Sequence, residues 1–195
     1  MIKAAIIGGT GYGGMELLRH LLYHPAVEVG AVTSRRHTGR VDAVHDHLRG
    51  FTDLEFSAAA PEQLAQDHDV VFFATPHGVA AEAASGVLDA GCRVIDLSGD
   101  HRLADAEAYR THYGKQHGHP ERLGTAAYGL PECGHRDAVV DANLVANPGC
   151  HATATIIALW PLHVAGLIAG RVPVVSVTGS SGSGSEPRAT THHPE

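Results

Sequence analysis

The sequence predicts an α/β protein built on a Rossmann-like, doubly wound parallel sheet. Short apolar runs alternate with stretches of helical periodicity, which is the pattern of successive β-α-β units. The apolar runs lack polar alternation, as expected for parallel strands that are covered on both faces. A glycine-rich turn over residues 8–14 joins the first run to the first helix. Together these observations predict a sheet of the dinucleotide-binding type.

Five strands are expected in the first hundred residues. They occupy the ranges 2–7, 27–34, 54–57, 69–76 and 92–99. A helix over 14–24, a short helix beginning at Pro61 and a helix over 78–91 separate most of them, and a loop is expected over 39–54. In the first helix one face is apolar, and it consists of Leu17, Leu18, Leu21 and Leu22.

The second half of the chain is less regular. Residues 100–135 are rich in His, Gly, Tyr and charge, and we expect a long irregular excursion there. A strand over 142–149, a helix over 150–165 and a strand over 172–179 follow. The chain then ends in a Gly/Ser-rich and polar tail with no closing element, so we expect a truncated catalytic segment.

Composition argues against several classes of protein. The net charge is -7 and only 18% of residues are charged, which gives no general attraction to nucleic acid or to anionic membranes. Neither a signal peptide nor a membrane span is predicted. The three cysteines, Cys92, Cys133 and Cys150, are widely spaced, which favours reduced thiols in the cytoplasm. The histidines show no metal-ligand spacing, so no metal site is expected.

The turn "GGTGYGG" contains the spacing G-x-G-x-x-G as Gly9, Gly11 and Gly14. Glycines permit a tight turn and a close approach of the backbone to a pyrophosphate, and the helix behind offers free N–H groups. The position between a strand and a helix favours dinucleotide binding over a merely tight turn. The expected cofactor-binding residues here are Gly9, Thr10, Gly11, Tyr12 and Gly13.

The second strand ends in Thr33, Ser34, Arg35 and Arg36. An NAD site would normally carry an acidic residue here for the ribose hydroxyls. Hydroxyl and guanidinium groups suit a 2′-phosphate instead, so Ser34, Arg35 and Arg36 predict NADP(H). The alternative is a solvated basic loop.

Cys150 follows Asn147-Pro148-Gly149 and begins a long apolar helix. A helix N-terminus stabilises a thiolate, which is the reactive form of cysteine. The alternative is a small buried apolar residue, which is the reading preferred for Cys92, whereas Cys133 is ambiguous. A nicotinamide cofactor beside a reactive thiol predicts one chemistry: the thiolate attacks an acyl phosphate, and hydride then reduces the thioester to an aldehyde.

These motifs, in this order, resemble the N-acetyl-gamma-glutamyl-phosphate reductases of arginine biosynthesis, including lysine-pathway members. The stretches are "GGTGYGGMELLRHLLYHP", "VTSRR", "FFATPHG", "VIDLSGDHRL", "YGLPE" and "NPGCHATA", and the resemblance covers residues 2–193. It implies that Cys150 is the nucleophile and that residues 9–13 and 34–36 bind NADP. It also implies an NADP-binding Rossmann domain over 1–148, the start of a glyceraldehyde-3-phosphate-dehydrogenase-like catalytic domain over 149–195, and a homo-oligomer.

Two departures from the family pattern are visible. The "GHRH"-type motif with the catalytic histidine is absent, which indicates that the chain is an N-terminal portion. Gly99 and His101 stand where the family usually has Ala and Phe. The resemblance implies N-acetylglutamyl phosphate as substrate. Alternatives are an aminoadipyl or glutamyl phosphate on an acidic carrier protein, met by Arg35, Arg36, Arg40 and Arg49, and a non-catalytic NADP-binding fragment. Aspartate-semialdehyde dehydrogenase ranks below these.

Several further residues are weaker candidates. Ser98 and Arg102 follow a strand at the edge where ligands gather, and Arg102 suits a carboxylate or phosphate as well as a strand-end salt bridge. His192 and His193 resemble substrate-loop histidines of the family. His77 is expected to start a helix rather than to act as a catalyst.

Overall fold

A single mixed sheet forms the centre of the computed structural model, which describes residues 1–185. Its strands are β1 (Ile2–Ile7), β2 (Val27–Thr33), β3 (Gly39–Arg40), β4 (Glu55–Ser57), β5 (Val70–Phe73), β6 (Arg93–Asp96), β7 (Ala127–Tyr128) and β8 (Leu144–Ala146). Their order across the sheet is β3-β4-β2-β1-β5-β6-β8-β7. Every neighbouring pair is parallel except β3 and β4.

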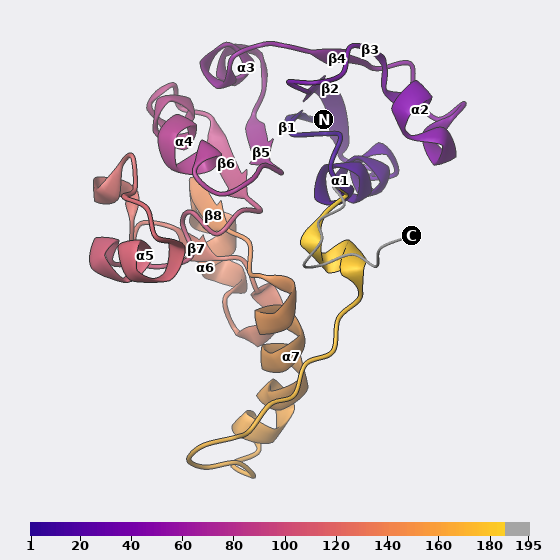
Figure 1. The fold of residues 1–195 in the computed structure, drawn as a ribbon. Coiled ribbons are helices and arrows are strands. Elements are labelled where there is room, and N and C mark those ends of the chain that lie inside the picture. Colours follow the sequence, from indigo (N-terminus) through magenta and orange to yellow (C-terminus); the bar gives the residue numbers. More distant parts are fainter. Residues whose placement is uncertain (186–195) are drawn as a thin grey trace.

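The strand order is that of a doubly wound sheet (Figure 1). From β1 the chain moves outward through β2 to β4, and then crosses back to place β5, β6 and β8 on the other side of β1. The carboxyl ends of β1 and β5 therefore lie at the point where the winding reverses, which is where ligands bind in such sheets. The predicted fold class is confirmed.

Helices cover both faces of the sheet and divide the core in two. On one face, Leu18 and Leu21 of α1 (Tyr12–Leu22) pack with Val41 of α2 (Val41–Val44). On the other face, Leu64 of α3 (Pro61–Asp67) packs with Val87 of α4 (Val79–Asp89). The leucine face predicted for the first helix is confirmed, because Leu17 and Leu22 also pack against the first cluster.

Two expected loops contain regular elements. Residues 39–54 include β3, α2 and η1 (Asp46–Leu48). The excursion over 100–135 contains α5 (Ala106–Tyr113), η2 (Pro120–Arg122), β7 and η3 (Pro131–Cys133), and α6 (Arg136–Asp141) follows. Asp105 caps α5 by accepting a hydrogen bond from the Ala108 N–H, and Gly114 ends it in the left-handed conformation. Local capping chemistry therefore creates a helix where apolar periodicity is weak.

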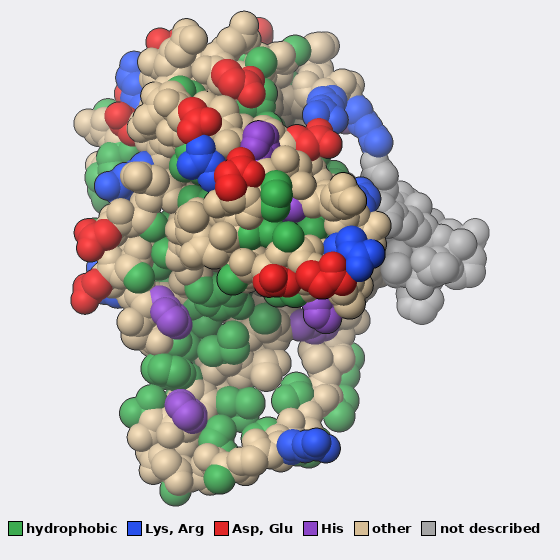
Figure 2. Space-filling view, turned by 90° about the vertical axis from the view of Figure 1, so that its left-hand side faces the viewer, with side chains coloured by type: hydrophobic (Ala, Val, Ile, Leu, Met, Phe, Trp, Pro, Cys, Tyr) green, Lys and Arg blue, Asp and Glu red, His purple; other side chains and the backbone are tan. Residues whose placement is uncertain are grey.

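The predicted helix after β8 is present as α7 (Cys150–Val164) and extends away from the sheet (Figure 1). The strand expected over 172–179 is wrong: those residues form no strand, and Val175 and Val177 are each 93% exposed. An apolar run needs a partner strand to become β-structure, and within residues 1–185 no strand pairs with this one. Apolar side chains gather at the α7 end of the molecule (Figure 2).

The chain finishes its described part with η4 (Ser180–Ser183). Among residues 1–185, none of the helices combines the length and the apolar character needed to cross a membrane.

Candidate functional site

The glycine turn between β1 and α1 uses its glycines in two different ways. Gly8, Gly9 and Gly14 are packed against other groups: a Cβ on them would lie 2.4 Å from the Ala74 carbonyl oxygen, 2.2 Å from Val32 Cγ1 and 2.3 Å from the Gly8 carbonyl oxygen, respectively. Gly11 and Gly13, in contrast, face open space, with no atom within 4 Å of an added Cβ. The turn therefore leaves room for a ligand at the mouth of α1, which fits a dinucleotide phosphate.

The mouth of α1 is chemically suited to an anion. Gly11 is the N-cap and brings no side chain to satisfy the first N–H groups, and the first turn contains no acidic residue. Such free N–H groups, together with the helix dipole, bind phosphates. Of the other predicted contact residues, Thr10 is half-buried and Tyr12 is 45% exposed at the first helical position.

Adding a methyl group at Gly14 is expected to unfold or distort this turn, whereas the same change at Gly13 is not. Gly14→Ala should lower the free energy of unfolding by at least about 2 kcal/mol, because the clash is with backbone and cannot be relieved by a rotamer change. Gly13→Ala should leave it unchanged or raise it by up to about 1 kcal/mol, because alanine favours a helix. Urea unfolding of both variants measures the difference; equal losses would contradict the packing role of Gly14.

Two groups outside the turn hold it in place. The Thr33 carbonyl oxygen at the end of β2 accepts hydrogen bonds from the N–H groups of Gly8 and Gly9, at 3.3 and 3.0 Å. His45, which is buried, places its Nε2 2.7 Å from the Gly9 carbonyl oxygen. The sequence analysis did not identify His45, because its role depends on α2 folding back over the start of α1.

Ser34 acts on the arginine loop rather than presenting its hydroxyl to solvent. The side chain is nearly buried, and its Oγ accepts hydrogen bonds from the N–H groups of Arg36 and His37, at 3.1 and 3.0 Å. This local turn fixes the direction of the chain after β2. Arg35 is exposed at its tip.

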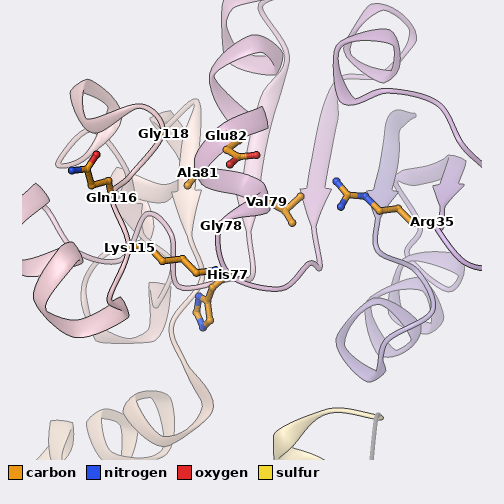
Figure 3. Close-up of a pocket in the computed structure, with 9 residues that line it drawn as sticks. All are labelled: Arg35, His77, Gly78, Val79, Ala81, Glu82, Lys115, Gln116 and Gly118. Carbon is orange, nitrogen blue, oxygen red and sulfur yellow. The ribbon is translucent and has the colours of Figure 1, made fainter.

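Arg35 lines an open hollow of about 250 Å³ at the carboxyl edge of the sheet (Figure 3). The lining comes from three places: Arg35 after β2, the first turn of α4 with the residues before it, and the segment that follows α5. The residues are Arg35, His77, Gly78, Val79, Ala81, Glu82, Lys115, Gln116 and Gly118.

Through its carboxylate, Asp100 connects the start of α4 to Tyr109 of α5 at this end of the sheet. Its fully buried carboxylate accepts hydrogen bonds from the Gly78 N–H, at 2.8 and 2.9 Å, from the Ala81 N–H at 3.0 Å and from the Tyr109 hydroxyl at 2.9 Å. Burial alone would raise the pKa of Asp100, but these hydrogen bonds outweigh it and lower the pKa below its ordinary value. Burial, together with the hydrogen bond to Asp100, raises the pKa of Tyr109 above its ordinary value.

A second buried group lies beside Asp100. The Asp96 carboxylate accepts a hydrogen bond from the Ser98 N–H and lies 2.8 Å from His101 Nδ1, and both Asp96 and His101 are buried. The His101 ring meets the His117 ring edge to face at 5.1 Å. Burial and the neighbouring His101 lower the pKa of His117, which favours its neutral form.

Ser98 and Arg102, both predicted substrate residues, make internal contacts in this edge. The Ser98 Oγ accepts a hydrogen bond from the Asp100 N–H at 3.1 Å. The Arg102 guanidinium donates to the carbonyl oxygens of Leu97 at 2.8 Å and Asn147 at 2.7 Å. Arg102 Nη1 also lies against Gly149, 3.1 Å from where a Cβ would stand. Arg102 thus joins the strand end after β6 to the turn before α7.

Cys150 is the first residue of α7 and is exposed, whereas Cys92 and Cys133 are buried. Gly149 is the N-cap and makes no side-chain cap, so it leaves the first N–H groups of α7, which begins at Cys150, without a side-chain acceptor. The Asn147 N–H donates to the Asp96 carbonyl oxygen at 2.8 Å, and this bond fixes the turn to the end of β6. Burial raises the pKa of Cys92, which keeps that thiol protonated.

The remaining predictions concern His192 and His193, a metal site, and His77. His192 and His193 lie outside the described residues. Within the described part of the chain, no group of three or more His, Cys, Asp or Glu side chains is arranged to hold a metal ion. His77 precedes α4, as expected, and its Nδ1 accepts a hydrogen bond from the Gly99 N–H at 3.0 Å.

Comparison with protein families assigns both parts of the chain. Residues 3–142 match the family described as semialdehyde dehydrogenase, NAD binding domain. Residues 150–195 match the family described as semialdehyde dehydrogenase, dimerisation domain.

Curated relatives agree with the resemblance read from the motifs. An N-acetyl-gamma-glutamyl-phosphate reductase from Acidithiobacillus ferrooxidans is 53% identical over 169 residues, covering 86% of this chain and 48% of the relative. A [LysW]-L-2-aminoadipate/[LysW]-L-glutamate phosphate reductase from Sulfurisphaera tokodaii is 45% identical over 197 residues, covering 100% of this chain and 56% of the relative. The chain therefore spans about half the length of the curated relatives it matches.

Solved structures show the same fold. An aspartate semialdehyde dehydrogenase with NADP from Candida albicans superposes with a TM-score of 0.61 and 19% identity, covering 86% of this chain and 48% of that one. The Vibrio cholerae aspartate semialdehyde dehydrogenase II has a TM-score of 0.60, also at 19% identity, covering 94% and 48%.

Proposed function

The chain belongs to the semialdehyde dehydrogenase family, and from this premise we propose that it supplies the NADP site and the nucleophile of an acyl-phosphate reductase. The observation that carries the proposal is the placement of Cys150. It is the exposed cysteine of the three, it begins a helix, and Arg102 and Asp96 hold the turn in front of it. We retain a domain division at residues 148 and 149, and a homo-oligomer, as predictions.

The chain's own residues account for binding and for the first chemical step. The open face of the glycine turn binds the cofactor phosphates, and the loop organised by Ser34 presents Arg35 and Arg36 to the 2′-phosphate. The Cys150 thiolate attacks the acyl carbon, a C–S bond forms, and the C–O bond to phosphate breaks, so that inorganic phosphate leaves. The N–H groups at the start of α7 stabilise the negative charge on the thiolate and on the acyl oxygen.

NADPH supplies the hydride that reduces the thioester to an aldehyde. Release of the aldehyde would break the C–S bond and return Cys150 as a thiolate. The chain's contribution at this stage is to keep the acyl group at the carboxyl edge of the sheet, where the glycine turn and Cys150 both lie.

We propose N-acetylglutamyl 5-phosphate as the substrate, with N-acetylglutamate 5-semialdehyde as the product. The names of several relatives support it. An aminoadipyl or glutamyl phosphate on an acidic carrier protein is the second candidate, supported by the Sulfurisphaera tokodaii relative. The basic patch expected to meet such a carrier is partly neutralised, because Arg40 pairs with Asp42 and Asp53 and Arg49 pairs with Asp46.

Trapping the acyl intermediate tests the proposal directly. The protein is incubated with N-acetylglutamyl phosphate without NADPH, and intact-mass and peptide mass spectrometry then locate the adduct. We expect one acetylglutamyl group on Cys150 and release of inorganic phosphate. An acyl group on Cys92 or Cys133, or on no cysteine, would contradict the proposed nucleophile.

Arg35→Ala is expected to weaken NADPH binding by about tenfold or more and NADH binding by less than about twofold. The guanidinium meets only the charge that distinguishes the two cofactors, and a charge-assisted hydrogen bond contributes about 1.5–3 kcal/mol. Fluorescence titration with each cofactor measures the two dissociation constants. Arg19→Ala, on the exposed outer part of α1, is the matched control. Equal losses of affinity for NADPH and NADH would contradict the assignment of Arg35 to the 2′-phosphate.

A further inference from the structure

The hollow that Arg35 lines has a second cationic wall, which the motifs did not identify. Lys115 extends toward Gly78 and His77 at the start of α4 (Figure 3). Its Nζ lies 3.8 Å from where a Cβ on Gly78 would stand. With Glu82 as the acidic residue in the lining, positive charge exceeds negative charge around the hollow.

The segment that carries Lys115 is fixed on both sides. Before it, Gly114 ends α5 in the left-handed conformation. After it, the buried His117 ring packs against Tyr109 at 5.0 Å, and Gly118 lies against α4 so tightly that a Cβ would stand 2.9 Å from the Ala81 carbonyl oxygen. A long, exposed side chain on such an anchored segment is directed into the hollow at little cost in backbone entropy.

The position of the hollow along the sheet indicates whether it is nearer to the cofactor's adenosine phosphate or to the substrate's acyl phosphate. Arg35 follows β2, whereas Cys150 follows β8, and β1, β5 and β6 lie between those strands. Four strand spacings of about 4.8 Å separate the two strand ends by roughly 19 Å. Arg35, which forms the wall on the β2 side, therefore lies on the adenosine side of the glycine turn, whereas the other walls of the hollow follow β5 and α5.

We propose that Lys115 is a specificity-determining residue for the cofactor, forming with Arg35 a two-sided clamp on the adenosine 2′-phosphate of NADP(H). This proposal rests on the proposed NADP site and adds to it a cation from a distant part of the chain. The ammonium group binds phosphate as a point charge, which complements the planar guanidinium of Arg35. The Gly78 and Ala81 N–H groups take no part, because Asp100 already occupies them.

The chain offers a matched control, because Lys3 and Lys115 are its two lysines. Lys3 lies near the amino end of β1, whereas the glycine turn follows the carboxyl end of the same strand. Titrations of the wild type, Lys115→Gln and Lys3→Gln with NADPH, NADH and adenosine 2′,5′-bisphosphate separate the contributions. We expect Lys115→Gln to weaken NADPH and the bisphosphate about tenfold, to change NADH less than about twofold, and Lys3→Gln to change none of them.

Each outcome has one meaning. An equal loss of NADPH and NADH in Lys115→Gln, or no loss of either, overturns the clamp while leaving the NADP site intact. If the wild type binds NADPH no more tightly than NADH, the proposed cofactor preference fails first, and the clamp fails with it.

A chemical footprint gives a second readout that does not depend on a variant. Acetylation by an N-hydroxysuccinimide ester, followed by peptide mass spectrometry, reports on both lysines at once. We expect adenosine 2′,5′-bisphosphate to slow acetylation of Lys115 and to leave Lys3 unchanged. Protection of neither lysine at a saturating concentration would overturn the clamp.

Discussion

Replacing Cys150 by serine is expected to abolish acyl transfer and to lower the rate of acyl-phosphate reduction by about 10⁴-fold or more. A serine hydroxyl is a much weaker nucleophile than a thiolate, and loss of a covalent nucleophile has effects of this size. The trapped acetylglutamyl adduct should disappear in Cys150→Ser. NADPH binding should change less than about twofold, because the glycine turn and the arginine loop are separate from α7.

Iodoacetamide provides the control within the same chain. The wild type should be labelled fastest at Cys150, because that thiol is exposed while the other two are buried. Cys92→Ala should keep this fast labelling, and Cys150→Ser should lose it. Fast labelling that persists in Cys150→Ser would show that another thiol is the accessible one and would remove the main support for the proposed nucleophile.

Asp100→Asn is expected to lower the free energy of unfolding by about 3 kcal/mol. The carboxylate is fully buried and accepts hydrogen bonds from the Gly78 and Ala81 N–H groups and from the Tyr109 hydroxyl. An amide places an NH2 group, which is a donor, against one or more of these donors, and a buried donor without an acceptor costs about 1–3 kcal/mol. Urea unfolding measures the loss. Asp53→Asn, whose side chain is 92% exposed, is the matched control and should change stability by less than about 0.5 kcal/mol.

The same carboxylate predicts a dependence on acid. The pKa of Asp100 is lower in the folded chain than its ordinary value near 3.8. Its contribution to stability is therefore fully present above about pH 4 and is lost as the pH falls through the lowered folded pKa. The difference in stability between wild type and Asp100→Asn should shrink below pH 4. A difference that stays constant from pH 7 to pH 2 would contradict the ionised state of Asp100.

The sequence predicts those parts of the fold that depend on local patterns. Apolar runs identify the central strands, and the spacing of Leu18 and Leu21 identifies the face of α1. The strand expected over 172–179 fails because apolar character does not supply a partner strand. The helix α5 is missed because its signals are the capping residues Asp105 and Gly114 rather than a periodic apolar face.

For the candidate site, too, the sequence predicts the residues that lie in local motifs and not those that packing brings beside them. Motifs predict the glycine turn, the arginine loop and Cys150 as site residues, because each lies between a strand and the element that follows it. His45 and Lys115 come from elsewhere in the chain and meet these motifs only after the helices have packed. Asp100 lies within the quoted stretch "VIDLSGDHRL", but its contacts with the start of α4 and with α5 also form only in the folded chain. Nothing local marks a histidine that contacts a carbonyl oxygen 36 residues away.

The outermost strands of the sheet, β3 and β7, are each two residues long. Exposed strand edges act as templates on which further chains can add by backbone pairing, and short edges deny them a sufficient row of N–H and C=O groups. Edge-to-edge fibrillation through this sheet is therefore blocked at both margins. The exposed valines that follow α7, Val172, Val174, Val175 and Val177, offer an apolar surface away from these margins at which copies of the folded chain could associate.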